Sequence, residues 1–522
     1  MRIGLSGAVV LLVVGNGLSA AEPRVVRPFE GAVGFKSANR IDTPVAAALR
    51  ERDIAPANRC SDEVFVRRVY LDVIGTLPEP QAVQAFLQDD DRRKREKLID
   101  ELLVRDEFAD YWAMKWCDLL RVKAEFPINL WPNAVQAYHR WIRDAVRDNM
   151  PYDQFARELL TSSGSNFRVP PVNFYRAVQG RAPATMAEAV ALTFMGTRLQ
   201  SWPEVDRNHM AVFFSRVAFK ATTEWKEEII CLDPAPGEAL DVTLPDGTAV
   251  RLLPEQDPRA AFADWLLTPE NPWFTRNIAN RVWSWFFGRG IVHEPDDIRP
   301  DNPPSNPELL ERLEKELVRA NYDPRRFFRL ILNSATYQQS SIPQSDHREA
   351  EALFAYYPVR RLDAEVLIDA LCWAFGGGES YTSVIPEPFT FIPESQRTIA
   401  LADGSISSQF LEMFGRPARD TGLESERNNQ PTDAQRLHML NSSHVQKRIQ
   451  QSARLRRVIT TYRRNQPALI SGIYLTILSR YPTDTELVAA QDYFGTGGLT
   501  LDQAVADLAW VLVNSKEFLY RH

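Results

Sequence analysis

An acidic loop near residue 295 holds the densest group of potential metal ligands in the sequence. Five such residues share it: His293, Glu294, Asp296, Asp297 and Asp301. Carboxylate oxygens on a loop stiffened by Pro295 suit Ca²⁺ or Mg²⁺, so the loop is a candidate cation site. We favour a solvated acidic loop without metal, because the turn at 302–307 supplies a cap, Ser305 or Asn306, for a helix that begins at Pro307.

Two glutamates form a second candidate site. Glu424 and Glu426 lie in a loop-rich segment together with Arg416 and Arg427. Paired carboxylates can divide the roles of general acid and general base, as in glycoside hydrolysis. Ion pairs with the two arginines are the favoured alternative, because a fixed guanidinium keeps a carboxylate ionised and makes it a poor acid. The candidate catalytic residues are therefore Asp296, Asp297, Glu424 and Glu426, and none of them is assigned a role.

Other chemistry finds little support in the sequence. The signatures HExxH, GxSxG, GxGxxG and the P-loop do not occur. The formal net charge of −7 argues against a nucleic-acid partner, which requires a basic face to displace counterions from phosphate. These observations exclude several large enzyme classes and leave a binding protein or a carboxylate-dependent enzyme.

The four cysteines are Cys60, Cys117, Cys231 and Cys372. They are far apart and form no CxxC or CxxCH. An oxidising compartment would permit disulfides in three alternative pairings. We slightly favour free thiols, because a chain of this size does not need covalent crosslinks to be stable.

The elements that must position these residues are mostly helices. Ser61 is a candidate N-cap, and apolar residues follow it at helical spacing from Phe65 to Val73. The exception surrounds Pro245-Asp246-Gly247, where alternating apolar residues predict a β-hairpin. We therefore predict a mainly α, multi-helical protein in two parts, with a small β-hairpin insertion between the halves.

The N-terminus predicts export. Arg2, an apolar stretch from Leu5 to Val14 and the small residues Ser19-Ala20-Ala21 form a signal peptide that is cleaved before Glu22. An uncleaved anchor is the alternative, but the stretch is shorter than the roughly 20 residues that span a bilayer. We expect the mature chain in the periplasm or at the cell surface, with no transmembrane span after cleavage.

The predicted segments after the signal peptide follow from these patterns. They are an extended leader (22–57), an N-terminal helical domain (58–232), a hairpin linker (233–256) and a C-terminal helical domain (257–522), with the signal peptide at 1–21.

Several motifs carry a resemblance to two families. In the first half these are residues 67–78 (RRVYLDVIGTLP), 111–121 and 149–153, and together they resemble the domain of unknown function 1549 (DUF1549), the planctomycete-type cytochrome-associated domain. In the second half, residues 271–276, 280–290, 302–307, 414–417, 424–427 and 478–482 resemble DUF1553, which normally accompanies it. The motif residues are Arg68, Asp72, Trp116, Asp118, Arg276, Asn280, Arg281, Trp283, Gly288, Asn306, Arg416 and Arg427.

The sequence departs from these relatives where they bind haem. Many relatives carry CxxCH after the stretch that matches Phe194 to Gln200, whereas here Ser201-Trp202-Pro203 follows and His209 lies outside the motif. A Cys-Glu-Cys-Glu-Arg run of relatives likewise reads Leu-Glu-Ser-Glu-Arg at 423–427. Without these thiols we expect no covalent haem and predict no cofactor.

Three functions remain open. The first is an exported helical scaffold or binding module in a cell-envelope complex, with an envelope protein as partner. The second is a carboxylate-dependent hydrolase that acts on polysaccharide. The third is a haem-free relative that docks on a cytochrome-type partner.

Overall fold

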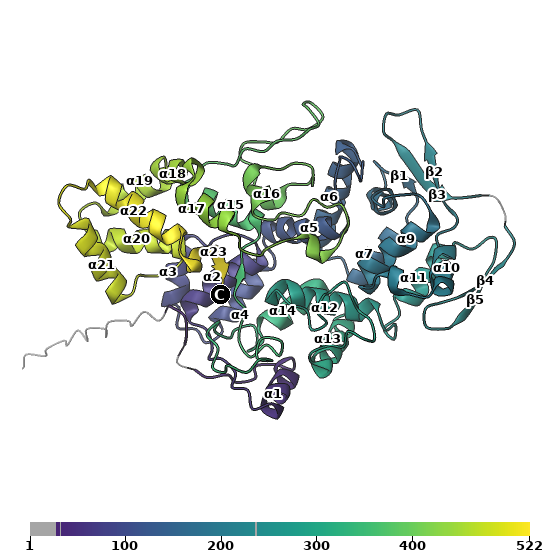
Figure 1. Ribbon diagram of the computed structural model, residues 1–522, viewed down its shortest axis with the longest axis horizontal. Coiled ribbons are helices and arrows are strands. Elements are labelled where there is room, and N and C mark those ends of the chain that lie inside the picture. Colours follow the sequence, from purple (N-terminus) through teal and green to yellow (C-terminus); the bar gives the residue numbers. More distant parts are fainter. Residues whose placement is uncertain (1–27, 32, 235–236) are drawn as a thin grey trace, which may run out of the picture.

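The structure, a computed structural model, describes residues 28–31, 33–234 and 237–522. The predicted signal peptide lies outside these residues. About half of the chain is helical and the strands are short, which confirms the prediction of a mainly α protein. The molecule is elongated: residues 433–513 gather at one end, residues 204–252 at the other, and the helices between them form the middle (Figure 1).

The first half of the chain is a series of short helices. They are α1 (Asp42–Glu51), α2 (Asp62–Val73), α3 (Pro80–Gln88), α4 (Lys94–Leu102), α5 (Asp106–Leu119), α6 (Pro132–Arg147), α7 (Tyr152–Thr161), α8 (Asn173–Arg176), α9 (Pro183–Val190) and α10 (Glu204–Val212). The predicted cap of α2 is confirmed, because the Ser61 hydroxyl accepts a hydrogen bond from the Val64 amide.

The leader is not extended throughout, and this prediction needs correction. Helix α1 lies within it, because Asp42 at its start accepts hydrogen bonds from the Ala38 and Asn39 amides. Val45 and Leu49, one helical turn apart, are fully buried, and α1 packs against α13 (Pro307–Arg319). Burial of this apolar stripe stabilises a helix whose periodicity is weak in the sequence.

The strands form three small sheets. They are β1 (Gly164–Ser165), β2 (Val217–Ala221), β3 (Glu228–Leu232), β4 (Leu240–Thr243), β5 (Ala249–Leu252), β6 (Arg360–Arg361) and β7 (Tyr520–Arg521). Strands β4 and β5 form the predicted hairpin, with Val242 opposite Val250 and Asp246-Gly247 in the turn. The antiparallel sheet β1-β3-β2 was not predicted, and it lies within the segment expected to be helical.

The second half is again helical. Its helices are α11 (Pro258–Leu266), α12 (Phe274–Phe287), α13, α14 (Pro324–Leu332), α15 (Ala364–Phe375), α16 (Gln409–Met413), α17 (Asp433–Asn441), α18 (Ser443–Gln450), α19 (Ala453–Tyr462), α20 (Gln466–Leu478), α21 (Asp484–Phe494), α22 (Leu501–Val513) and α23 (Lys516–Leu519). Asn306 caps α13 by accepting from the Leu309 amide at 3.0 Å, as predicted. None of the helices in the described ranges is long and apolar enough to cross a membrane.

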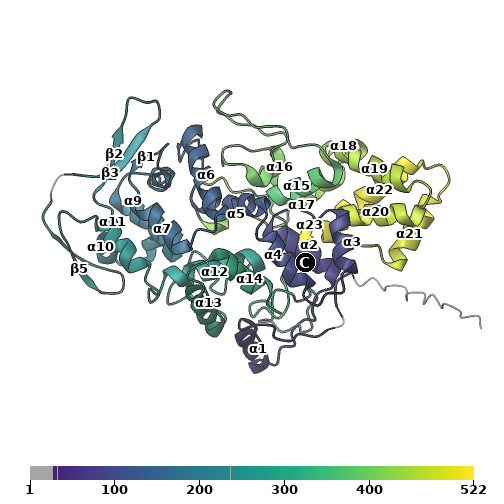
Figure 2. The same ribbon diagram turned by 180° about the vertical axis from the view of Figure 1, so that it is seen from behind.

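The two halves pack into each other in the middle of the molecule. The C-terminal residues lie against α2 and α4 in both views (Figures 1 and 2). Buried Arg67 on α2 donates to the carbonyls of Ile477 and Phe518, at 2.9 and 3.2 Å. Strand β7 pairs with β6 so that Arg521 stands opposite Arg360. Residues from both ends of the chain therefore meet at one place.

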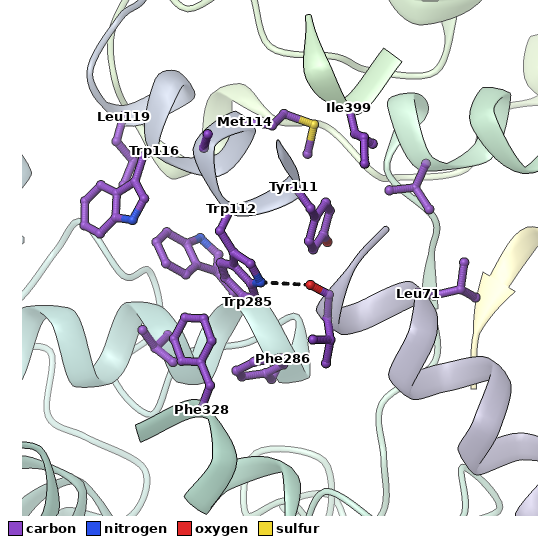
Figure 3. Close-up of a cluster of buried hydrophobic side chains, with 14 of the residues drawn as sticks. Leu71, Tyr111, Trp112, Met114, Trp116, Leu119, Trp285, Phe286, Phe328 and Ile399 are labelled. Atoms are coloured by element: carbon purple, nitrogen blue, oxygen red, sulfur yellow. Dashed lines mark hydrogen bonds between the residues drawn. The ribbon is translucent and has the colours of Figure 1, made fainter. Parts of the chain in front are cut away.

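An aromatic cluster joins α5 to α12 at this place (Figure 3). The rings of Trp112 and Trp285 lie 5.5 Å apart between centroids, and Trp112 lies 4.4 Å from Phe328. The Trp112 indole donates to the Val73 carbonyl at 3.1 Å, which ties α5 to the end of α2. These large buried rings fix the relative positions of three helices whose polar residues form the site described next.

Candidate functional site

A polar cavity of about 630 Å³ lies in the middle of the molecule. Its wall combines residues of α5, α12, the loop after α12, β6, the segment 424–431 and β7. The charged or ionisable side chains of its lining are Lys115, Arg289, His293, Glu294, Glu351, Arg360, Arg361, Asp363, Glu424, Arg427 and Arg521. The cavity is therefore bounded by both halves of the chain and by both signs of charge.

Asp363, at the start of α15, is the centre of the charges in the cavity wall. Its carboxylate lies 3.1 Å from the Lys115 ammonium and 3.1 Å from the Arg521 guanidinium, and it accepts from the Tyr111 hydroxyl at 3.2 Å. Burial by itself would raise the pKa of Asp363, but Lys115, Arg521 and Arg427 hold it well below the ordinary value. Asp363 is thus a permanently charged anchor for the basic side chains.

Asp72 on α2 is a second buried carboxylate, and it shares the Arg521 guanidinium with Asp363. It lies 2.9 Å from Arg360 and 2.9 Å from Arg521, so it holds both arginines of the paired strands β6 and β7. Its second oxygen accepts from the hydroxyls of Tyr337 and Tyr357, at 2.8 and 2.9 Å. The carboxylate is only 1 % exposed, and it is satisfied by hydrogen bonds from Arg360, Tyr337 and Tyr357 and by the charge of Arg521.

Arg427 links the two halves beside the cavity. It lies 2.6 Å from Asp118 on α5 and 2.7 Å from Glu365 on α15. Burial would raise the pKa of Glu365, but Arg427 and then Arg416 lower it to about 2. Arg419 approaches the other oxygen of Asp118 at 2.9 Å. The motif residues Asp118, Arg416 and Arg427 therefore belong to one buried charge network.

Glu424 is the predicted catalytic candidate that lines the cavity. It accepts from the Trp285 indole at 3.0 Å and lies 3.4 Å from Arg281. Burial raises its pKa, although Arg281 and Lys115 oppose this effect. Glu424 therefore retains its proton to a higher pH than an ordinary glutamate, while Asp363 across the same lining remains ionised.

Lys115 is the basic counterpart of this carboxyl. The side chain is 8 % exposed, and burial lowers its pKa despite the Asp363 carboxylate at 3.1 Å. A lysine with a lowered pKa and a glutamate with a raised pKa in one cavity are the kind of groups that exchange protons with a ligand.

Arg361 forms no ion pair with a carboxylate of the described residues, unlike Arg360, Arg427 and Arg521. It is 4 % exposed, and one nitrogen donates to the carbonyls of Phe414 and Asn428. Its Nε and Nη1 atoms are buried and have no hydrogen-bond partner among the described residues. Burial lowers its pKa, and Asp363, whose charge partly offsets this, is already held by Lys115 and Arg521. The cavity wall thus contains a guanidinium whose hydrogen-bonding capacity is largely unused.

The other three predicted carboxylates do not reach the cavity. Asp296 is 0 % exposed and is paired with Arg281 at 2.7 Å, where it also accepts from the Glu424 amide. Asp297 pairs with Arg299 at 3.2 Å. Glu426 accepts from the Asp420 and Thr421 amides at 2.9 and 3.3 Å. Of these three carboxylates only Asp296 lies next to Glu424, and it is fully buried in an ion pair with Arg281.

The ion pairs expected for Glu424 and Glu426 with Arg416 and Arg427 do not form. The reason is the 3-10 turn Glu424–Glu426, which directs Glu424 to Arg281 and Glu426 back to its own loop. Arg416 and Arg427 pair instead with Glu365 on α15. Glu424 does form an ion pair, but with Arg281, whereas Glu426 forms hydrogen bonds within its own loop and no ion pair among the described residues.

The acidic loop does not gather its side chains around a common point. Asp297 and Asp301 both pair with Arg299, at 3.2 and 3.3 Å, whereas Asp296 faces Arg281. His293 and Glu294 line the cavity instead. Among the described residues, no three His, Cys, Asp or Glu side chains are placed to hold a metal ion.

The remaining motif residues support the structure around the site. Buried Arg68 donates to the Tyr337 and Gln339 carbonyls, and Asn280 bridges both backbone groups of Val292. Gly288 ends α12 with a φ of 71°, beside Arg360. Trp116 and Trp283 are core rings, and Arg276 pairs at the surface with Glu314 at 2.8 Å.

Trp202 follows the segment at which the resemblance would place a haem-attachment motif. The Trp202 indole donates to the Thr197 hydroxyl at 3.3 Å and packs on Trp273, with ring centroids 6.0 Å apart. His209 lies on the following helix, α10. All four cysteines are free thiols, as we slightly favoured; Cys60 and Cys117 are buried.

Sequence reasoning missed the residues that define the cavity. Arg361, Asp363 and Arg521 lie outside the motif stretches, and Lys115 lies in the stretch 111–121 but was not identified as a site residue. The four residues come from three segments that are distant in the sequence. One signal was available: Arg360-Arg361 and Asp363 surround the start of a strongly apolar helix, where charges need partners.

Two family models match the chain. Residues 40–205 match PSCyt2, a protein of unknown function (DUF1549), and residues 258–494 match PSD1, a protein of unknown function (DUF1553). No curated protein and no solved structure matches it. The sheet strands β2 to β5 lie between the two matches. The cavity is lined mainly by the second matched segment, to which Lys115 adds from the first and Tyr520 and Arg521 from the residues after the second.

Proposed function

The chain belongs to the proteins that carry a DUF1549 domain followed by a DUF1553 domain, and from this premise we propose that it is an exported ligand-binding module of the cell envelope. Its ligand is a polar, negatively charged molecule that occupies the cavity between the two domains. The protein acts by holding this ligand rather than by transforming it.

The buried guanidinium of Arg361 carries this proposal. Two of its nitrogens have no acceptor among the described residues, and leaving a buried charged donor unsatisfied is costly. The lining also contains six basic side chains, Lys and Arg, against four acidic ones. Carboxylates outside the lining (Asp72, Asp118 and Glu365) already pair with Arg360, Arg521 and Arg427. The arginines of the lining without an ion pair among the described residues are Arg289 and Arg361, and an anionic group placed in the cavity would accept hydrogen bonds from Arg361.

The size and the lining favour an acidic saccharide. A cavity of about 630 Å³ is in the range of small-molecule sites, and its wall adds the rings of Trp285, Phe287 and Tyr520 to the charged groups. Flat rings can pack against the apolar face of a sugar, while guanidinium groups bind its carboxylates. Uronic acid units meet both requirements.

Calorimetric titration with trigalacturonate tests this proposal. The fully methyl-esterified trisaccharide is the matched ligand without charge. We expect the free acid to bind and the ester to bind at least about tenfold more weakly, with the same loss for Arg361→Met, because both remove one partner of a charged contact. Arg276→Met, at the surface, is the matched control. Equal affinity for acid and ester would refute the proposal.

A hydrolase is the second candidate, and Glu424 is the observation that favours it. Its pKa is raised, and it shares the cavity with Asp363, an ionised carboxylate. A protonated and an ionised carboxyl in one site can act as acid and base. Release of reducing ends from polygalacturonate that is lost in Glu424→Gln would establish hydrolysis; binding without turnover supports the module.

Export and partnership complete the proposal. The small residues before Glu22 support cleavage there, and peptide mapping of the mature protein should find Glu22 at its N-terminus.

Exposed aromatic residues support a protein partner: Trp225 is 56 % and Phe391 72 % exposed, and Trp225 packs on Phe389 with ring centroids 5.5 Å apart. Affinity capture from envelope extracts should recover one reproducible partner with the wild type and not with Trp225→Ser.

The identity of that partner separates the scaffold from the cytochrome-docking idea. A pyridine haemochrome assay on the purified chain should be negative, because no CxxCH is present. The same assay on the captured complex reports whether the partner is a cytochrome. A haem signal from the complex alone would support docking on a cytochrome-type protein.

A further inference from the structure

A second cavity, of about 430 Å³, lies on the other side of the 420–426 segment. It has no lining residue in common with the first cavity. Residues 178–200 of the first domain and 420–423 of the second line it together with Arg121, which follows α5. Neither of the functions considered above uses this cavity.

Arg121 is a buried guanidinium without a carboxylate partner at bonding distance. It is 4 % exposed, its Nε donates to the Thr421 carbonyl at 3.0 Å, and its Nη1 is buried without a hydrogen-bond partner among the described residues. Burial lowers its pKa to about 10. Gly422 packs directly on it, since a Cβ there would lie 3.0 Å from Nε, so the guanidinium is held in place.

The neighbouring carboxylates are committed to other groups. Those whose charges reach Arg121 are Glu426 and Asp296. Glu426 accepts from two amides of its own loop, and Asp296 is paired with Arg281 at 2.7 Å. Of the two carboxylates in the lining, Asp420 is held by Lys123 at 2.6 Å, and Glu188 is the other. No described carboxylate therefore forms an ion pair with Arg121.

The unpaired donor belongs to a cavity wall. Because Arg121 lines the cavity, a ligand bound there can supply the acceptor oxygens that the described residues do not provide. The buried Tyr138 hydroxyl, which also lacks a partner among the described residues, is not part of this lining and takes no part in the site.

We propose that this second cavity is an oxyanion-binding site, which takes a phosphate, sulfate or carboxylate group on Arg121. Arg198, also in the lining, adds a second positive charge at the more exposed side. The anion would neutralise the buried charge of Arg121 as Asp118 does for Arg419 and Asp296 does for Arg281.

Titration calorimetry in a buffer free of oxyanions tests the site. The probes are inorganic phosphate and sulfate as free ions, and glycerol 3-phosphate for an esterified group; preference between them identifies the source. We expect Arg121→Met to weaken binding at least about tenfold and Arg198→Met, at an exposed position of the lining where the fold should remain intact, to weaken it severalfold. Arg361→Met, in the first cavity, should leave this binding event unchanged.

A crystal soaked in selenate provides the structural readout. Anomalous density beside Arg121 is the expected result. Density for an ordered water only, or selenate bound only elsewhere, would overturn the proposal, as would phosphate affinity that is the same in wild type, Arg121→Met and Arg198→Met. Because Arg361→Met is tested in parallel, failure of the acidic-saccharide proposal leaves this result interpretable.

Discussion

Arg427 and Asp118 meet at 2.6 Å, and this ion pair joins the DUF1553 domain to the DUF1549 domain beside the central cavity. Both side chains are buried, at 7 % and 12 % exposure. Arg427 also donates to Glu365 from Nη1 and from Nη2, the nitrogen that binds Asp118, so one guanidinium neutralises two carboxylates from different domains.

Loss of Arg427 should destabilise the whole protein. Arg427→Met leaves Asp118 and Glu365 buried with fewer counter-charges, and we expect a loss of about 3–5 kcal/mol in the free energy of unfolding. Urea denaturation followed by circular dichroism measures it. Arg276→Met, which breaks a half-exposed pair with Glu314, should cost about 1 kcal/mol or less. Similar costs for both variants would show that the junction is not held by this charge.

Glu424 should make ligand affinity depend on pH. Its raised pKa means that the carboxyl becomes neutral as the pH falls while Asp363 stays ionised, and loss of a negative charge from the wall favours an anionic ligand. Affinity for trigalacturonate should therefore increase as the pH is lowered through the pKa of Glu424. Glu424→Gln should bind tightly at all pH values tested. A wild-type profile that persists in this variant would assign the effect to another group.

His139 should make the fold sensitive to acid. Burial lowers its pKa to about 3, and Arg419, Arg143 and Arg140 contribute. The unfolded chain therefore takes up this proton first, so the free energy of unfolding should fall as the pH drops from about 6.5 towards 3, by up to roughly 1.4 kcal/mol per pH unit.

Comparison of two variants isolates that contribution. His139→Leu should flatten the pH profile of the urea midpoint in this window, whereas His347→Leu, at an exposed position, should retain the wild-type slope. An unchanged slope in His139→Leu would contradict the prediction.

A side chain at position 288 should destabilise the protein. The φ of 71° at Gly288 is left-handed, and a Cβ there would lie 2.8 Å from the Arg360 Cδ. Gly288→Ala should lower the unfolding free energy by about 1–2 kcal/mol and disturb the pairing of Arg360 with Asp72. Gly497→Ala, where a Cβ meets nothing within 4 Å, is the matched control. Thermal unfolding of both variants measures the difference.

Much of the fold could be predicted because local patterns determine it. Ser61 and Asn306 cap helices as their types suggest, and Pro245-Asp246-Gly247 turns a hairpin. Helix α1 and the sheet β1-β3-β2 were missed, because burial against distant segments stabilises them and no local pattern reports it.

The candidate site was predicted only in part. Motif residues such as Asp72, Asp118 and Arg427 do belong to the central charge network, and Glu424 does line the cavity. Their partners could not be read from the sequence: Glu424 and Arg427 are three residues apart but bind Arg281 and Asp118, more than a hundred residues away. The direction of each side chain depends on one 3-10 turn.

The amino-acid sequence alone determined the helical class, the two families and the absence of a haem-attachment motif, because spacing and residue type are sufficient for each. The tertiary structure decided which charges are satisfied. Lys115, Arg361 and Asp363 become neighbours in one wall only when α5, β6 and α15 pack together, and burial then changes their pKa values. Arg361 and Arg121 each have buried nitrogens without a hydrogen-bond acceptor among the described residues. Only the tertiary structure shows this, because the acceptors around a buried side chain come from segments that are distant in the sequence.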